Sequence, residues 1–419
     1  MAHVYAADAP VPANDRAHVG AGRWERRAAA LCLAQFSEPF FAALAQSQGL
    51  TEPPDYARVF FLPVYAFIGW ALWRERREAW AAMRAAPLLT ALVAFAFLSA
   101  SWSIDSGGTL RRAVWLTLTM LFALYLAWRY DWRGLLSVAA GAFLALVAGS
   151  FATALFAPSI GVMANEHPGA WSGLWTHKNT LGGLMAIGAP ICAAAAVIDA
   201  ERRRLWLAVA FGALLLVLQS TSKTALLAAL LGLATIAAGA FVRRGPMQAL
   251  IAVAALGVFV IALTTLTAFA PQALVALLGR DLTLTGRTDI WQFAATYAGR
   301  RPWLGYGYYA FWLDPNGPAY WVREAVRWQV ASAHNGWLEV ALGIGRAGVA
   351  LFLLQFLATL WRGVRAWLDP RAGLWAPAFL VAFGFYSMSE SHILQANDLF
   401  WIFYVAVAAR LALDAKERA

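Results

Sequence analysis

One histidine marks the point where a polar, aromatic-rich stretch gives way to a long apolar run. From His334 the chain reads His-Asn, then nine residues, then Gly345-Arg346-Ala347-Gly348. Histidine titrates near neutral pH, so this side chain can serve as a base, an acid or a hydrogen-bond donor. A histidine at a membrane boundary can also do no more than cap the helix that follows it. Both interpretations are open at His334, and the rest of the chain has to discriminate between them.

Four other short motifs carry charged or hydrogen-bonding groups beside long apolar runs. Placing an ionisable group within a membrane costs free energy. Ionisable groups that face the interior of a helix bundle are therefore functional candidates. Lys223 follows three hydroxyl residues, and a cation with nearby donors suits a phosphate group. The alternative for Lys223 is that it snorkels to the membrane surface. The motifs are Trp175–Asn179 with His177 and Asn179, Gln219–Thr224 with Lys223, Gly286–Asp289 with Arg287, and Ser387–His392 with Glu390.

The sequence patterns of soluble enzymes do not compete with these motifs. The chain contains no P-loop, no His-Glu-x-x-His, no Gly-x-Ser-x-Gly and no cysteine pair with zinc spacing. Cys32 and Cys192 both fall in apolar runs, where we expect small buried hydrophobic residues. We therefore predict neither a metal site nor a cofactor.

The composition predicts an all-α polytopic membrane protein. The 419 residues are 61% hydrophobic and only 13% charged, whereas a soluble protein carries roughly a quarter charged residues. Apolar runs near the length of a membrane-spanning helix recur about twelve times. The first run is the weakest, because Gln35, Ser37, Glu38 and Pro39 interrupt it. The predicted spans are 28–49, 56–73, 86–103, 110–128, 134–157, 179–198, 204–220, 223–242, 248–270, 336–360, 373–390 and 398–414.

The predicted spans divide the chain into five parts. These are a cytoplasmic tail (1–27), nine spans (28–270), one long loop (271–335), three spans (336–414) and a short cytoplasmic tail (415–419). The first part lacks the apolar core and small-residue cleavage site of a removed signal peptide.

The net charge of +10 follows the predicted topology. If the N-terminus is cytoplasmic, every short cytoplasmic segment holds at least two basic residues, as the positive-inside rule requires. The basic excess is then topological, so we predict no nucleic-acid partner. Both termini are expected in the cytoplasm. Topology leaves unexplained the basic residues on the opposite side: Arg58, Arg111, Arg112, Lys178, Lys223 and six arginines of the long loop.

The long loop 271–335 is too long to be only a connector. Its pattern predicts a helix over Thr288–Gly299, ended by Arg301-Pro302, then turns at Gly305-Tyr306-Gly307 and Asp314–Gly317. Pro318–Val330 predicts an amphipathic helix at the outer membrane surface, with Trp321 on its aromatic face. Its aromatics can anchor the helix at the membrane surface, and its arginines can contact ordinary lipid phosphates. Farther on, Gly336, Gly343, Gly345 and Gly348 predict close approach between helices.

These motifs resemble the O-antigen ligase (WaaL) family, within the superfamily of O-antigen ligases, polymerases and related oligosaccharyltransferases. The resemblance spans nearly the whole chain, including the single large loop late in the sequence. The ligase signature is met by His334, Asn335, Gly345 and Gly348, and a His-x-Asn motif is met by His177 and Asn179. A Gly-Arg pair at the loop helix is met by Gly286 and Arg287. The family's Ser-x-Ser-Arg element at an outer corner corresponds to Ser220-Thr221-Ser222-Lys223, with lysine in place of the usual arginine. Lysine keeps the positive charge but loses the bidentate fork of arginine.

The resemblance implies a GT-C-like fold and a glycosyl transfer at the periplasmic face of the inner membrane. The implied donor is an O-antigen on undecaprenyl diphosphate, and the implied acceptor is a hydroxyl of the lipid A-core oligosaccharide. No metal, nucleotide or ATP takes part. Arg287, Lys223 and Arg301 would stabilise the leaving diphosphate, and His334 would be the general base or a positioning group. Asn335, His177, Asn179, Glu390 and Trp321 are the weaker candidates for substrate contact.

Two other interpretations have to be kept. A polysaccharide polymerase or a protein O-oligosaccharyltransferase would use the same donor with another acceptor. Polymerases typically carry arginines followed by glycine eleven positions on, and no arginine of the long loop does so. A secondary transporter would show two related halves with polar groups at the membrane midplane, and neither feature is seen. The sequence does not indicate an oligomeric state, and its only other expected partners are membrane lipids.

Overall fold

The chain is a helical bundle in the computed structural model, which describes residues 22–41, 44, 59–252, 254, 287–314, 316–327, 329–366 and 375–417. Within these ranges there is no β-strand, only an isolated bridge between Val162 and Trp171. The predicted all-α class is therefore confirmed. Most of the predicted span 248–270, the first part of the loop (271–286, with Gly286) and Trp328 lie outside the described residues.

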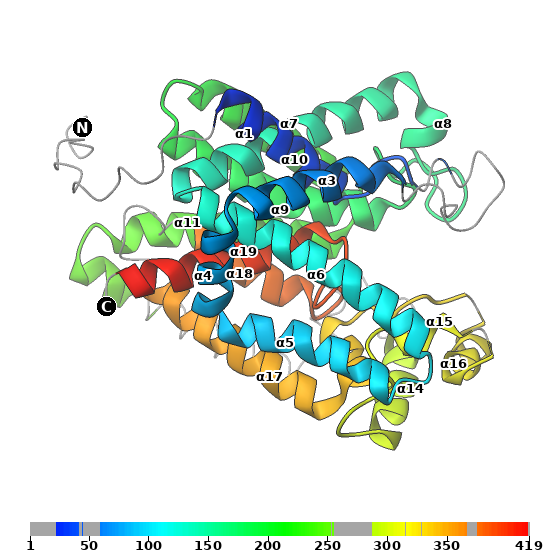
Figure 1. The fold of residues 1–419 in the computed structure, drawn as a ribbon. Coiled ribbons are helices and arrows are strands. Elements are labelled where there is room, and N and C mark those ends of the chain that lie inside the picture. The colour runs from blue at the N-terminus through cyan, green and yellow to red at the C-terminus, as the bar shows by residue number, and fades with distance from the viewer. Residues whose placement is uncertain are drawn as a thin grey trace.

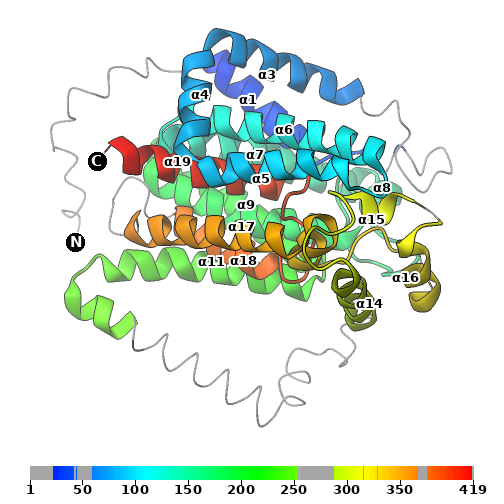
Figure 2. The ribbon, with the colours of Figure 1, turned by 60° about the horizontal axis from the view of Figure 1, so that its bottom comes forward.

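The helices run roughly along one direction and pack around α9 and α19 (Figures 1 and 2). Helix α9 is rich in glycine and alanine and packs against α7, α10, α11 and α18. Helix α19 packs against α6, α17 and α18. The bounds are α1 Arg23–Gln35, α3 Leu62–Arg74, α4 Arg76–Ala85, α5 Pro87–Leu98, α6 Ser106–Arg129, α7 Trp132–Phe156, α8 Pro158–Gly161, α9 Lys178–Ile198, α10 Arg203–Gln219, α11 Lys223–Val242, α14 Arg287–Arg300, α15 Ala310–Leu313, α16 Pro318–Val326, α17 Gly336–Ala366, α18 Trp375–Tyr386 and α19 Leu399–Glu417.

Five of the described helices are long and apolar enough to cross a membrane. A sixth span is possible if α4 and α5, which meet at 94°, count as one broken helix. The number of twelve spans thus stays a prediction. The weak first span behaves as its interruptions indicated: α1 ends at Gln35, and Glu38 and Phe40 have backbone φ angles of 53° and 65°.

The loop helices α14, α15 and α16 lie together at one end of the bundle, opposite the end where α19 finishes (Figures 1 and 2). They have a small core of their own, which includes Ile290, Tyr297, Phe311 and Val322. Helix α16 turns Ala319 and Val322 into this core and leaves Trp321 exposed. The described part of the loop, from residue 287 onward, is therefore a folded unit, with a third short helix that the sequence did not predict.

Helix α17 is broken at Ile344 and Gly345, and the loop segment 302–307 fills the break. Gly345 has φ +68°, and a Cβ atom there would lie 2.2 Å from the carbonyl oxygen of Trp303. The glycine thus admits loop backbone, which corrects the predicted role of close approach between helices. The backbone hydrogen bonds run from Tyr306 to Leu342 (2.8 Å), from Gly307 to Gly343 (2.9 Å) and from Arg346 to Pro302 (2.7 Å).

Candidate active site

A cavity of about 1050 Å³ lies beside the loop, which contributes Tyr309, Ala331 and His334 to its wall. One part of its wall is apolar and aromatic, with Phe36, Phe41, Phe61 and Leu184. The other part is polar and comes from segments far apart in the chain. The polar lining includes Arg112, Glu166, His177, Asn179, His334, Glu390, His392, Asn397 and Asp398. A concave space with a few convergent polar groups is the usual form of a small-molecule site.

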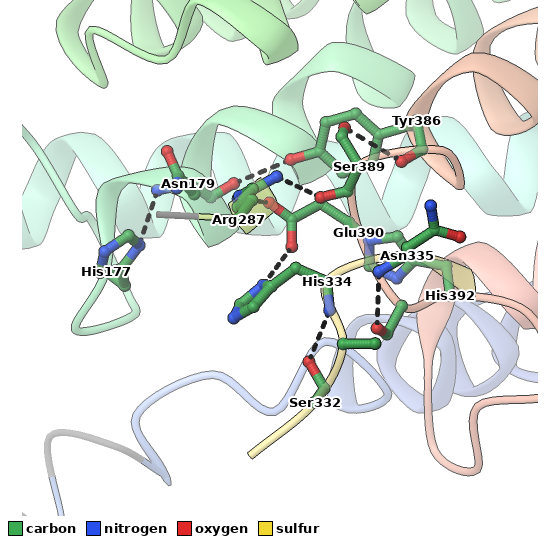
Figure 3. Close-up of polar contacts among 12 residues, drawn as sticks. His177, Asn179, Arg287, Ser332, His334, Asn335, Tyr386, Ser389, Glu390 and His392 are labelled. Atoms are coloured by element: carbon green, nitrogen blue, oxygen red, sulfur yellow. Dashed lines mark hydrogen bonds and ion pairs between the residues drawn. The ribbon is translucent and has the colours of Figure 1, made fainter. Parts of the chain in front are cut away.

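His334 stands on the wall of this cavity, directly before α17. Its backbone is in the left-handed region (φ 47°), which is uncommon for a residue other than glycine. Such conformations persist where the surrounding structure enforces them, and they cluster at active sites. The imidazole Nδ1 lies 3.1 Å from Oε2 of Glu390 (Figure 3). The side chain is 28% exposed, so it remains open to the cavity.

Glu390 lies between His334 and Arg287 and contacts each through a different oxygen (Figure 3). Arg287 donates to Oε1 of Glu390 over 2.6 Å and also to the carbonyl of Ser389. Burial by itself raises the pKa of Glu390, but the hydrogen bond with His334 and the Arg287 charge outweigh it and lower this pKa to about 2. Glu390 is therefore an ionised carboxylate at neutral pH.

The ionised state of Glu390 fixes the tautomer of His334. A carboxylate only accepts hydrogen bonds, so Nδ1 of His334 has to be the donor. The neutral imidazole then carries its lone pair on Nε2. A histidine oriented by a carboxylate in this way is the usual design of a general base, since the carboxylate also stabilises the imidazolium that forms. Nε2 of His334 could then accept a proton from a hydroxyl group bound in the cavity.

Asn335, a predicted substrate contact, instead ties two segments of the site together. Its Oδ1 accepts from the backbone of Trp337 and Leu338 and so caps α17, while its Nδ2 donates to the carbonyl of Met388 (3.1 Å). The Gly336 amide donates to the carbonyl of Ser387 (2.9 Å). These bonds hold the segment 387–391, and with it Glu390, against the start of α17.

His177 and Asn179 also line the cavity, from the start of α9. His177 accepts the Asn179 amide through Nδ1 (3.2 Å) and so caps α9, and burial lowers its pKa. Tyr386 donates its hydroxyl to the carbonyl of Asn179 (3.2 Å), which joins α9 to α18. The two predicted residues are thus brought next to the His334 and Glu390 pair (Figure 3).

The other predicted residues do not line the cavity. Lys223 begins α11 at the corner with α10, where Lys178 donates to Thr221 (3.1 Å). Arg301 stacks over Tyr306, 5.0 Å from the ring centre. Trp321 is 63% exposed on α16. Arg287 lies behind Glu390 rather than on the cavity surface. Diphosphate binding by these cations stays a prediction.

Two residue pairs on the cavity wall were not predicted. His392 lies 2.9 Å from Asp398, whose other oxygen accepts the Trp401 amide and caps α19. Burial by itself lowers the pKa of His392, but the Asp398 carboxylate more than offsets this and raises it. The other pair is Arg112 with Tyr309. The sequence signals were the His392 position in the Ser387–His392 motif and the unexplained charge of Arg112.

Three possible metal ligands lie close together, two of which, Glu166 and His177, line the cavity. Ligand atoms of Glu166, His167 and His177 all lie within 4.8 Å of one another. His177 Nδ1 already accepts a hydrogen bond, so its proton belongs on Nε2, which lies 3.9 Å from Glu166. A protonated nitrogen cannot coordinate a metal, so this geometry favours an electrostatic contact between His177 and Glu166.

Comparison with known proteins identifies a matching family and a similar protein. Residues 207–353 match the family described as O-Antigen ligase, a range that contains Arg287 and His334 but ends before Glu390. The chain is also similar to the exopolysaccharide production protein ExoQ of Rhizobium meliloti (strain 1021), with 28% identity over 279 residues. That alignment covers 63% of this chain and 62% of the length of the relative. The resemblance to the O-antigen ligase family is thereby confirmed over residues 207–353.

Proposed function

We propose, from the match to the O-antigen ligase family and the geometry of the site, that this chain transfers a glycan from a polyprenyl diphosphate to an acceptor hydroxyl. The donor would be an O-antigen on undecaprenyl diphosphate, and the acceptor the lipid A-core oligosaccharide. The reaction would take place at the periplasmic face of the inner membrane. The single observation that carries the proposal is the His334 and Glu390 pair on the wall of a large, partly apolar cavity.

The proposed step moves one proton and exchanges one bond. Nε2 of His334 takes the proton of the acceptor hydroxyl as its oxygen attacks the anomeric carbon of the donor sugar. The bond from that carbon to the diphosphate oxygen breaks, and the electron pair leaves with the diphosphate. Glu390 stabilises the imidazolium that forms, at a distance of 3.1 Å. Arg287 keeps Glu390 ionised and holds its carboxylate in place beside His334.

The partly apolar lining suits this donor. A polyprenyl diphosphate joins a hydrocarbon chain to a charged group, so its site needs both surfaces within a few ångströms. Phe36, Phe41 and Phe61 supply the apolar part, and the polar groups opposite supply the other. General-base assistance of this kind contributes roughly 10²–10⁴-fold to a rate.

A polysaccharide polymerase is the second candidate. The observation that favours it is the similarity to a protein named for exopolysaccharide production. The same proposed chemistry would then extend a growing glycan instead of modifying lipid A-core.

The decisive experiment is His334→Ala in a strain deleted for the native gene. Lipopolysaccharide ladders and secreted polysaccharide are measured beside a blot for protein in the membrane. His167→Ala is the matched control, because His167 is exposed and does not line the cavity. We expect His334→Ala to abolish the product at normal protein level, and His167→Ala to retain it.

The product that disappears identifies the acceptor. Loss of the lipopolysaccharide ladder supports the ligase, and loss of secreted polysaccharide alone supports the polymerase. Normal amounts of both products with His334→Ala would remove this residue from catalysis. If the complete deletion also leaves both products unchanged, the proposed function is wrong.

A further inference from the structure

Arg112 is a charged group of the cavity that the proposed reaction does not use. It lies in the second turn of α6, is partly buried and lines the same cavity as His334 and Glu390. Its guanidinium stands 4.2 Å from the centre of the Tyr309 ring and 5.5 Å from that of Trp115. Both aromatic residues also line the cavity.

No described carboxylate lies within ion-pair distance of Arg112. Several other arginines of the described chain have such partners: Arg287 pairs with Glu390, Arg129 with Glu25, and Arg410 with Asp414. An aromatic face attracts the cation but leaves the N–H groups at its edge available. A guanidinium held against aromatic rings in this way presents a planar fork that matches the oxygens of a phosphate or carboxylate.

The elements that hold Arg112 are fastened to one another by bonds that do not involve it. The Thr109 hydroxyl donates to the carbonyl of Tyr308 (3.0 Å), and the Tyr308 amide donates to the hydroxyl of Ser99 (2.8 Å). The Ile104 amide donates to the carbonyl of Tyr306 (2.9 Å). The start of α6 and the segment 304–309 therefore form one unit. Arg112 is not needed to join them, so its charge is available for a ligand.

We propose that Arg112, held against Tyr309, binds an oxyanion group of the substrate, either a phosphate of the donor or a carboxylate of an acidic sugar. The inference rests on the proposed function in taking the cavity as the substrate site. It adds a cation on α6, separate from the pair of Arg287 with Glu390. It also makes the charge of the substrate a determinant of binding.

The test measures binding to the purified full-length protein in detergent by isothermal titration. The probes are undecaprenyl diphosphate, a tetrasaccharide that contains glucuronic acid, and the matching tetrasaccharide with glucose in its place. The variants are Arg112→Gln, Arg112→Lys and Arg111→Gln. Arg111 is the matched control, since it is the adjacent residue of α6 but is exposed and does not line the cavity.

We expect Arg112→Gln to weaken at least one anionic probe tenfold or more and to leave the neutral sugar unchanged. Arg112→Lys should lose less, because it keeps the charge without the fork, and Arg111→Gln should behave as the wild type. A loss confined to the lipid assigns the donor phosphate, and a loss confined to the uronate assigns an acidic sugar. Equal binding of both anionic probes by the wild type and Arg112→Gln overturns the inference, as does a wild type that binds neither.

The outcome is separable from that of the proposed function. Binding is measured without transfer, and His334→Ala is expected to retain the Arg112-dependent binding. If the deletion strain makes normal polysaccharide but Arg112→Gln still loses anion binding, the oxyanion site stands and the proposed transfer does not. Thermal unfolding of each variant checks that it folds, and Arg112→Lys keeps the test decisive if Arg112→Gln does not.

Discussion

Glu390 connects the charges of the site at the scale of single residues. One oxygen accepts from Arg287 and the other from His334, so each oxygen of the carboxylate has a partner. The pKa of Glu390 falls from 4.5 to about 2, because these partners outweigh the burial that by itself raises it. A carboxyl whose pKa is lowered by folding stabilises the fold at pH values above its unfolded pKa. This contribution is lost as the pH falls through the folded pKa of about 2. The pair with Arg287 therefore persists throughout the physiological range.

The first prediction concerns Glu390→Gln. Glutamine keeps the shape and still accepts the His334 N–H, but it removes the negative charge that stabilises the imidazolium. We expect the turnover rate to fall roughly 10²–10⁴-fold, with a much smaller change in KM. Initial transfer rates of purified protein measure both constants. Glu324→Gln is the control, because Glu324 is exposed on α16 and does not line the cavity. A rate for Glu390→Gln within threefold of the wild type would contradict the role of the carboxylate.

The second prediction concerns the pH dependence of stability through His392. Burial by itself lowers its pKa, but Asp398 raises it above the ordinary value of 6.5 in the folded state. The His392 and Asp398 pair therefore stabilises the fold fully below about pH 6.5. This stabilisation is lost as the pH rises through the pKa of His392 in the folded state. We expect the difference in Tm between the wild type and His392→Gln to be larger at about pH 5.5 than at about pH 9.

Thermal unfolding in detergent, followed by tryptophan fluorescence, measures this difference. His392 also stacks on Phe400 with ring centres 4.0 Å apart, so part of the loss will not depend on pH. The comparison between the two pH values removes that part. An equal difference in Tm at both values would show that the charge of His392 does not matter.

At the scale of elements, the break in α17 explains why glycine is needed at position 345. Its φ of +68° is strained for any residue with a side chain, and the Cβ would meet backbone atoms of Trp303 and Leu304. These atoms belong to a segment that is itself fixed by hydrogen bonds to α17, so they cannot move aside cheaply.

The third prediction is that Gly345→Ala destabilises the protein by on the order of 3 kcal/mol or more, with loss of yield and activity together. The control is Gly299→Ala in the last turn of α14, where an added Cβ meets nothing within 4 Å. That variant should be neutral or more stable by roughly 0.5–1 kcal/mol. Thermal unfolding of both variants decides the matter, and a Gly345→Ala protein as stable as the wild type would refute the strain argument.

The sequence predicted helices well where a single apolar run decides the outcome. The predicted spans 179–198 and 223–242 agree closely with α9 (Lys178–Ile198) and α11 (Lys223–Val242). The span 373–390 was too long, because α18 ends at Tyr386 and the following residues bond to the start of α17. Such bonds join residues about fifty positions apart, which no local pattern reveals.

The same reason limits what the sequence showed of the site. His334, His177, Asn179 and Glu390 were predicted to share one face of the membrane, and the structure brings them to one cavity. The pairing of Glu390 with both His334 and Arg287 was not predictable, since it depends on how α14, α17 and the segment after α18 meet. Arg112 was noticed as an unexplained charge, but only its position on the cavity wall makes it a candidate ligand-binding residue.

At the scale of the whole molecule, the loop helices lie at the end of the bundle opposite the end of α19 (Figure 1), and the same loop contributes Tyr309, Ala331 and His334 to the cavity wall. The fourth prediction is the orientation that the basic loops indicate. In a variant without Cys32 and Cys192, Ser159→Cys after α7 and Glu201→Cys before α10 are both exposed. An impermeant maleimide should label Ser159→Cys in cells with a permeable outer membrane, and Glu201→Cys only after complete lysis. The reverse pattern would invert the topology and place the cavity in the cytoplasm.

The backbone hydrogen bonds between the segment 302–307 and α17 also bear on the order in which the parts of the protein fold during synthesis. The segment 302–307 leaves the ribosome before α17, yet its backbone partners lie in α17. Backbone groups that end up buried have to find those partners, so the loop cannot finish folding until α17 has been synthesised and inserted. Glu390 arrives later still, after α18. A chain whose synthesis stops before Glu390 therefore lacks the carboxylate that orients His334, and its unfinished loop stays open to proteolysis.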